Sequence, residues 1–269
     1  MLFIRRLHGA FMVAAWIGAA SCGILLARYF KKTWVGSQCC GKDLWFVFHR
    51  FFMVLTWVLT VAGVVLMLVE LKGLSAIPID KNPHALLGGI STILCFLNPF
   101  MALCRPAPDA KSRPIFNWSH WFVGNAAQIL GIVAIFYAIE LPKASLPTWM
   151  NWVVVAFVAF HVLAHLALSL HEKYVSRPTV GPLEGLAGAG LGMFSSSREQ
   201  RQHEMYAMRE IGMSNSPMYM EGKLEPKGGS FRRTMLGLYL VINWLFTAVL
   251  VVIVVLAPIE DYLKNWSLK

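Results

Sequence analysis

Six long apolar segments alternate with polar stretches along this chain of 269 residues. They cover roughly residues 7–29, 44–69, 84–104, 118–139, 149–170 and 234–258. Each segment is close to the ~20 residues that a helix needs to cross the hydrocarbon core of a bilayer. The first five are joined by short connections, which make consecutive helices antiparallel neighbours. The pattern predicts an all-α fold, a single transmembrane domain over residues 1–269 built as a six-helix bundle.

Composition agrees with this prediction and excludes an ordinary soluble domain. The chain is 57% hydrophobic and only 14% charged, which a water-exposed surface does not tolerate. The last connection, 171–232, differs from the others because it is rich in glycine and serine and then polar. We expect it to be a mobile cytoplasmic loop without a catalytic role.

The net charge of +10 reflects membrane topology rather than nucleic-acid binding, because the basic residues lie in loops between apolar segments. Of the 24 lysines and arginines, 17 fall in or beside the first, third and fifth connections. Short cytoplasmic loops are enriched in basic residues. We therefore expect these three connections in the cytoplasm and both termini outside it, although Arg5 and Arg6 before the first segment favour the opposite orientation.

A histidine stands near the start of each of the first four segments. These residues are His8, His49, His84 and His120, with spacings of 41, 35 and 36 residues. An ionisable side chain inside a bilayer carries a free-energy penalty, and binding of a ligand such as haem compensates for it. Because the chain alternates in direction, His8 and His84 share the outer level, while His49 and His120 share the inner level. The sequence thus predicts two haem sites, each with two histidine ligands, separated by about 20 Å in depth.

Two histidine ligands leave no open position on a haem iron, which favours electron transfer over oxygen chemistry. Two alternatives stay open at this point. One is a transporter whose histidines carry protons or bind a metal ion without porphyrin. The other is a haem-binding membrane protein with a structural or regulatory role.

The remaining histidines do not match these depths. We expect His161 and His165, in the fifth segment, to have a structural role or to neighbour a haem. His171 and His203 lie at or beyond the membrane boundary, and we expect both to be solvated.

Polar and small residues within the segments add detail to the four-helix core. Asn98, Asn125 and Gln128 are buried in apolar sequence and need internal hydrogen-bond partners. Asn98 should lie near the inner histidine level. Gly88 and Gly124 follow two of the histidines by one helical turn, where a missing side chain permits close approach of either a flat macrocycle or a neighbouring helix.

The five cysteines do not suggest a disulfide framework, because they fall in segments or in cytoplasmic connections. Cys39, Cys40 and Cys104 lie beside the membrane, where palmitoylation is chemically feasible. We expect unmodified thiols at these positions.

The stretches HGAFMVAAW, HRFFMVLTW, NPHALLG and FNWSHWFVGNAAQIL together resemble the cytochrome b561 superfamily, and within it the subgroup of DOMON-type ferric-chelate reductases. The resemblance covers about residues 7–171. It implies two haem b groups, with ligands paired first with third and second with fourth, as the chain direction also predicts. It further implies a cytoplasmic reductant, usually ascorbate, and an outer acceptor such as a ferric chelate or monodehydroascorbate.

The chain departs from that subgroup in two ways. A DOMON domain usually precedes the first span, whereas only seven residues do so here, and the basic motif that holds ascorbate is not recognisable. An anionic donor would still be attracted by the basic residues Arg28, Lys31, Lys32, Arg50, Arg105 and Arg113. Arg50 adjoins a predicted ligand and is also a candidate partner for a haem propionate. A homodimer is compatible with the sequence.

Overall fold

The computed structural model describes residues 2–75, 77–107, 109–175 and 227–257. Within this part, six helices are long and apolar enough to cross a membrane, so the predicted all-α, multi-pass architecture is confirmed. The first span consists of α1 (Leu2–Val13), the π-helical η1 (Ala14–Ala20) and α2 (Ser21–Tyr29). The others are α3 (Leu44–Leu71), α4 (Pro83–Leu103), α5 (Arg113–Ile139), α6 (Met150–Val175) and α10 (Gly229–Leu256).

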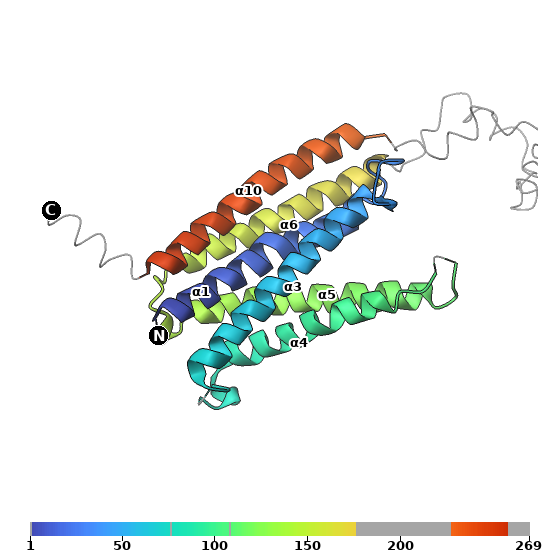
Figure 1. Ribbon diagram of the computed structural model, residues 1–269. Coiled ribbons are helices and arrows are strands. Elements are labelled where there is room, and N and C mark those ends of the chain that lie inside the picture. The colour runs from blue at the N-terminus through green and yellow to red at the C-terminus, as the bar shows by residue number, and fades with distance from the viewer. Residues whose placement is uncertain (1, 76, 108, 176–226, 258–269) are drawn as a thin grey trace, which may run out of the picture.

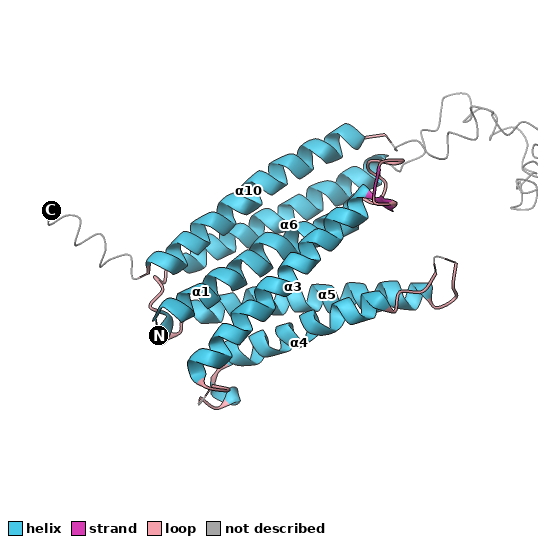
Figure 2. Ribbon diagram, in the orientation of Figure 1, coloured by secondary structure: helices cyan, strands magenta, loops and turns pink. Residues whose placement is uncertain are grey.

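The described parts of the connections contain only short elements (Figure 2). A two-residue antiparallel hairpin of β1 (Gln38–Cys39) and β2 (Lys42–Asp43) precedes α3. Single turns of 3₁₀-helix, η2 (Ile79–Lys81) and η3 (Pro142–Ala144), lie in the second and fourth connections.

Several helices extend beyond the predicted apolar limits. The first span begins at Leu2, which places Arg5 inside the helix, where it pairs with Glu70 of α3 at 3.2 Å. Helix α6 continues to Val175 and α10 begins at Gly229, so the prediction of a mobile loop over 171–232 is wrong at both ends. Its middle, 176–226, lies outside the described residues. Helices extend because backbone hydrogen bonds continue into the headgroup region, where polar side chains are also tolerated.

The first span lies at the centre of the bundle, with α3 on one side and α10 on the other (Figure 1). Small residues permit this packing. A Cβ atom at Gly18 would stand 3.1 Å from the Trp244 ring of α10, and one at Gly9 would stand 2.8 Å from Val254. The core includes the fully buried Ile17. The glycines of the first span therefore serve helix packing.

The π-helical turn is held by side chains from two neighbouring helices. Ser21 donates a hydrogen bond to the carbonyl of Trp16 and accepts one of 2.8 Å from Gln128 of α5. Asn243 of α10 donates to the carbonyl of Gly18. A wide turn frees carbonyl groups from the regular ladder, and these side chains satisfy them. The predicted need of Gln128 for an internal partner is thereby met.

Helices α4 and α5 form an antiparallel hairpin that lies against α3 and the first span. In Figure 1 this hairpin diverges from α3 toward the N-terminal end of α5. Gly88 and Gly124 face the contact within the hairpin, because a Cβ atom at Gly88 would meet Ala134 and one at Gly124 would meet Asn98. Both glycines therefore lie at a contact between helices.

Candidate functional site: two histidine pairs

The structure brings the four histidines of the first four spans together in two pairs. The rings of His8 on α1 and His84 on α4 have their centres 6.2 Å apart. Those of His49 on α3 and His120 on α5 have their centres 6.4 Å apart. Each pair joins helices that run in the same direction, so the two pairs lie toward opposite ends of the bundle. After the levels predicted from the sequence, we call His8–His84 the outer pair and His49–His120 the inner pair. This is the pairing that the alternating chain direction predicts.

The separation within each pair suits a metal ion held between two imidazoles. Two metal–nitrogen bonds of about 2.0 Å, plus about 1.2 Å from each nitrogen to its ring centre, place the centres about 6.4 Å apart. The ring planes are nearly perpendicular, at 86° and 78°. This angle is compatible with a shared metal ion, because rotation of either ring about its metal–nitrogen bond would change the angle without changing the distance between the ring centres.

Three of the four rings are oriented by backbone carbonyls through their Nδ1 atoms. The bonds, each 2.9 Å long, run from His8 to Gly63, from His49 to Gly23 and from His84 to Ala134. A carbonyl oxygen only accepts, so Nδ1 carries the proton and the lone pair of each Nε2 is available. Metal-binding histidines characteristically donate their other ring N–H in this way. These three imidazoles are therefore prepared to act as ligands.

The fourth ring, His120, is held differently. Phe116, one turn earlier on α5, stacks on it with ring centres 5.6 Å apart. Its Nδ1 atom is buried without a hydrogen-bond partner, and so is Oδ1 of Asn98. Asn98 lies beside Gly124, one turn after His120, near the inner pair as its position in the sequence predicts. Buried polar atoms without partners are rare and call for an explanation, and a group bound between these helices is compatible with both atoms.

Each pair supplies only two ligands. In the ranges that the structure describes, no group of three or more histidine, cysteine or acidic side chains is arranged to hold a metal ion. A porphyrin provides four equatorial nitrogens and needs only two axial ligands from the protein. The residues present therefore fit haem better than a bare metal ion.

His161 and His165 form a separate cluster on α6. Their ring centres are 4.5 Å apart. His161 Nδ1 lies 2.8 Å from the hydroxyl of Tyr239 on α10, and His165 Nδ1 lies 3.3 Å from that of Tyr29 on α2. These bonds join three helices and indicate a structural role.

The prediction that His171 is solvated is wrong. Its ring stacks on Phe231 with centres 4.2 Å apart, and its Nε2 atom is buried. The reason is that α6 continues, and α10 begins, beyond the apolar segments. The end of α6 therefore packs against the start of α10 at His171. His203 lies outside the described residues.

Basic side chains gather at the end of the bundle that holds the inner pair. The guanidinium carbons of Arg50 and Arg105 lie 5.7 and 4.7 Å from the ring centre of Phe46. The ammonium of Lys31 lies 5.8 Å from the ring of Trp45. Cations stabilised on aromatic faces keep their charge available to an approaching anion. We call Lys31, Arg50 and Arg105 the cationic surface. Its residues come from the first connection, from α3 and from the loop after α4.

The pKa of Lys31 reflects how closely these positive charges are placed. Partial burial, followed by the positive charges of Arg28, Arg105 and Arg113, lowers the pKa of Lys31. Such crowding costs free energy unless an anion relieves it. Lys31 and Arg105 also act electrostatically on His49, which places the cationic surface next to the inner pair.

The other predicted donor contacts have different surroundings. Arg28 lines a cavity with Ser169, Glu172 and Lys173 at the end of α6. Lys32 is exposed, and its backbone carbonyl accepts a hydrogen bond from Arg232 at 3.5 Å. Of the predicted residues, Lys31, Arg50 and Arg105 are the ones that gather around the aromatic rings at the start of α3.

Sequence reasoning missed the carbonyl acceptors at Gly23, Gly63 and Ala134, and also the ring of Phe46 between two arginines. Every residue has a carbonyl, so an acceptor leaves no signature in composition or spacing. The glycines gave the only available signal, since a helix can approach another helix closely at such a residue.

A family model described as eukaryotic cytochrome b561 matches residues 7–145. A Drosophila melanogaster protein named as a ferric-chelate reductase 1 homolog is 48% identical over 262 residues, which cover 96% of this chain and 37% of that protein. Ferric-chelate reductase 1 of Homo sapiens is 36% identical over 177 residues, covering 65% and 29%. An Arabidopsis thaliana cytochrome b561 and DOMON domain-containing protein is 30% identical over 141 residues, covering 52% and 36%. The chain spans about a third of the length of these relatives, and no solved structure matches it.

Proposed function

The chain belongs to the eukaryotic cytochrome b561 family, and we propose that it transfers electrons across a membrane through two haem b groups. One haem is held by His8 and His84 and the other by His49 and His120. The donor is ascorbate or a similar cytoplasmic reductant. The acceptor, on the opposite face, is a ferric chelate, as the names of the relatives suggest, or monodehydroascorbate.

The observation that carries this proposal is the pair of ring separations, 6.2 and 6.4 Å. Both values match the geometry of two imidazoles that share one metal ion. Haem iron with two imidazole ligands exchanges single electrons and has no open position for oxygen. The absence of a third protein ligand near either pair, among the described residues, supports haem over a bare ion.

The orientation of the histidine rings also supports haem binding. The carbonyls of Gly63, Gly23 and Ala134 hold three rings in one tautomer. A ligand oriented in this way loses little conformational freedom on binding, and its basicity is increased by the hydrogen bond that it donates.

The cationic surface at the inner end supports an anionic donor. Lys31, Arg50 and Arg105 gather there beside His49. Positive charge concentrated at one entrance raises the encounter rate of an anion such as ascorbate. The basic connections also support the orientation in which this end faces the cytoplasm and both termini face away from it.

The test is electron transfer across vesicles that contain the purified full chain. With ascorbate enclosed, we expect reduction of a ferric chelate outside at a rate well above that of protein-free vesicles. His49→Ala and His8→Ala should each abolish the excess rate. His171→Gln, which changes a histidine outside both pairs, should preserve it. An excess rate that persists in both alanine variants contradicts the proposal.

A further inference from the structure

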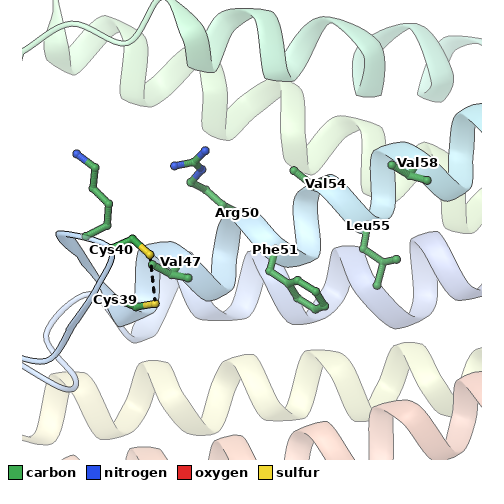
Figure 3. Close-up of a pocket in the computed structure, with 9 residues that line it drawn as sticks. Cys39, Cys40, Val47, Arg50, Phe51, Val54, Leu55 and Val58 are labelled. Carbon is green, nitrogen blue, oxygen red and sulfur yellow. Dashed lines mark hydrogen bonds between the residues drawn. The ribbon is translucent and has the colours of Figure 1, made fainter.

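An apolar groove runs along α3, and two thiols stand at its end. The cavity has a volume of ≈ 560 Å³. We call its apolar wall, Val47, Phe51, Val54, Leu55 and Val58, the α3 groove. Cys39, Cys40, Lys42 and Arg50 complete the lining. Figure 3 shows the two cysteines at the hairpin end of the helix, with the side chains of the groove following one another along it.

The α3 groove is separate from the histidine pairs. Each residue turns a helix by about 100°, so Val47, Val54 and Val58 lie on the face opposite His49. Side chains on this face are open to the outside of the bundle, with Val54 60% and Val58 48% exposed. The groove therefore faces lipid, whereas His49 faces the other helices.

Both thiols are placed by the β1–β2 hairpin. Cys39 and Cys40 are free and exposed, with their sulfur atoms 4.0 Å apart. Cys40 has a left-handed backbone, with φ of 51°, as a tight two-strand hairpin requires. The hairpin is followed directly by α3 at Leu44, so the thiols are held beside the start of the groove.

The two thiols call for an explanation of their own, because they take no part in the histidine pairs and stand exposed at the end of an apolar cavity. The sequence alone favours unmodified thiols at both positions. The α3 groove, which the sequence does not reveal, changes this interpretation, because juxtamembrane cysteines are sites of S-palmitoylation and the groove offers an apolar surface to the attached chain.

We propose that the Cys39–Cys40 pair is S-acylated and that the acyl chain lies in the α3 groove. The sulfur of one thiol attacks the carbonyl carbon of a long-chain acyl-coenzyme A. A new sulfur–carbon bond forms, the bond to the coenzyme A sulfur breaks, and the thiol proton passes to the released coenzyme A. No group is oxidised or reduced. The site depends on the proposed cytoplasmic position of the first connection and does not depend on haem.

The dimensions and charges of the groove fit this occupant. From Val47 to Val58 the helix rises about 16 Å, comparable with an extended long-chain fatty acyl group. Lys42 and Arg50 line the same cavity and suit the level of anionic lipid headgroups. A chain anchored at the thiols would start at this level and run toward the bilayer centre. A free phospholipid fits the apolar wall equally well, but it leaves the two thiols at the groove's end without a role.

The first experiment labels the full chain in eukaryotic cells with an alkyne-bearing fatty acid. We expect a signal that hydroxylamine removes, as it does for thioesters. The label on the double variant Cys39→Ser/Cys40→Ser should be at least tenfold weaker than on the wild type. The matched control Cys104→Ser should carry as much label as the wild type. Label that persists in the double variant, or intact-mass spectra showing free thiols or a Cys39–Cys40 disulfide in the wild type, would overturn the proposal.

The second experiment locates the chain. A fatty acid with a photoreactive group at its middle should cross-link to the peptide that contains Phe51 and Val54. Cross-links confined to α10 or to bulk lipid would overturn placement in the groove. The absorbance spectrum of the double variant serves as the folding control, and it should equal that of the wild type whether or not the proposed electron-transfer function is correct.

Discussion

The Nδ1 atom of His49 lies 2.9 Å from the carbonyl oxygen of Gly23, on the helix that precedes α3 in the chain. This bond fixes which nitrogen of the ring carries the proton. It leaves the lone pair of Nε2 available on a ring whose centre lies 6.4 Å from that of His120. The same arrangement recurs at His8 with Gly63. The orientation of these two rings therefore depends on the close approach of neighbouring helices at a glycine.

Replacing Gly63 by a larger residue should weaken haem binding at the outer pair, His8–His84, and leave the inner pair intact. A Cβ atom there would lie 2.7 Å from the end of the Met12 side chain and 3.5 Å from His8 Nδ1, so the branched side chain of Gly63→Val adds atoms next to the His8 ring and its hydrogen bond. We expect the haem content to fall from two to about one per chain, because small displacements weaken ligation that depends on an outer-shell hydrogen bond. Pyridine haemochrome analysis measures this content.

The matched control is Gly89→Val, at a helical glycine where an added Cβ meets nothing within 4 Å. It should keep both haems. Equal haem content in the two valine variants would show that the Gly63 contact does not support the outer site.

The cationic surface should govern reduction by an anionic donor. Arg105→Gln removes the charge nearest to Phe46, and we expect reduction by ascorbate to slow roughly tenfold at low salt. The difference from wild type should shrink as the ionic strength rises, because the screening length falls to about 8 Å at 0.15 M. Stopped-flow absorbance follows the rate. An uncharged reductant should show no such difference, and a salt-independent defect would point to a structural cause.

Lys31 should make this reduction sensitive to alkaline pH. Burial and three neighbouring arginines lower its pKa, so in the folded protein it loses its charge at a lower pH than an ordinary lysine. The rate with ascorbate should therefore begin to fall with rising pH earlier than for Lys31→Arg, whose charge persists. A pH series of initial rates compares the two proteins, and superimposable profiles would exclude a role for Lys31.

Tyr239→Phe should destabilise the bundle without affecting the haems. The change leaves Nδ1 of His161 without its partner at 2.8 Å, and an unsatisfied buried group costs about 1–3 kcal/mol. We expect a lower thermal midpoint in detergent and an unchanged haem spectrum. Tyr174→Phe, at an exposed tyrosine on α6, is the control. A changed spectrum in Tyr239→Phe would assign the His161 cluster to a haem site.

The hydrophobic pattern and chain direction predict most of the fold. Six spans follow from segment length, and the proximity of His8 to His84 and of His49 to His120 follows from alternating direction. Both depend on the bilayer, which forces helices to cross it fully and so limits their arrangement.

Features that depend on exact helix contacts were not predictable. The carbonyl of Ala134 accepts from His84, yet no property of alanine indicates this. The π-helical turn at Ala14–Ala20 depends on Asn243 and Gln128 from distant helices. The prediction that His171 is solvated failed because the length of an apolar segment indicates the membrane core and not the residue at which the helix ends.

The central claim is that each histidine pair holds one haem. A reduced-minus-oxidised absorbance spectrum of the purified chain, combined with haem quantification, tests it most directly. We predict the bands of haem with two imidazole ligands, two haems per chain in the wild type, and about one in each of His8→Ala and His49→Ala. A wild-type spectrum without these bands, or one that both variants leave unchanged, would contradict the claim.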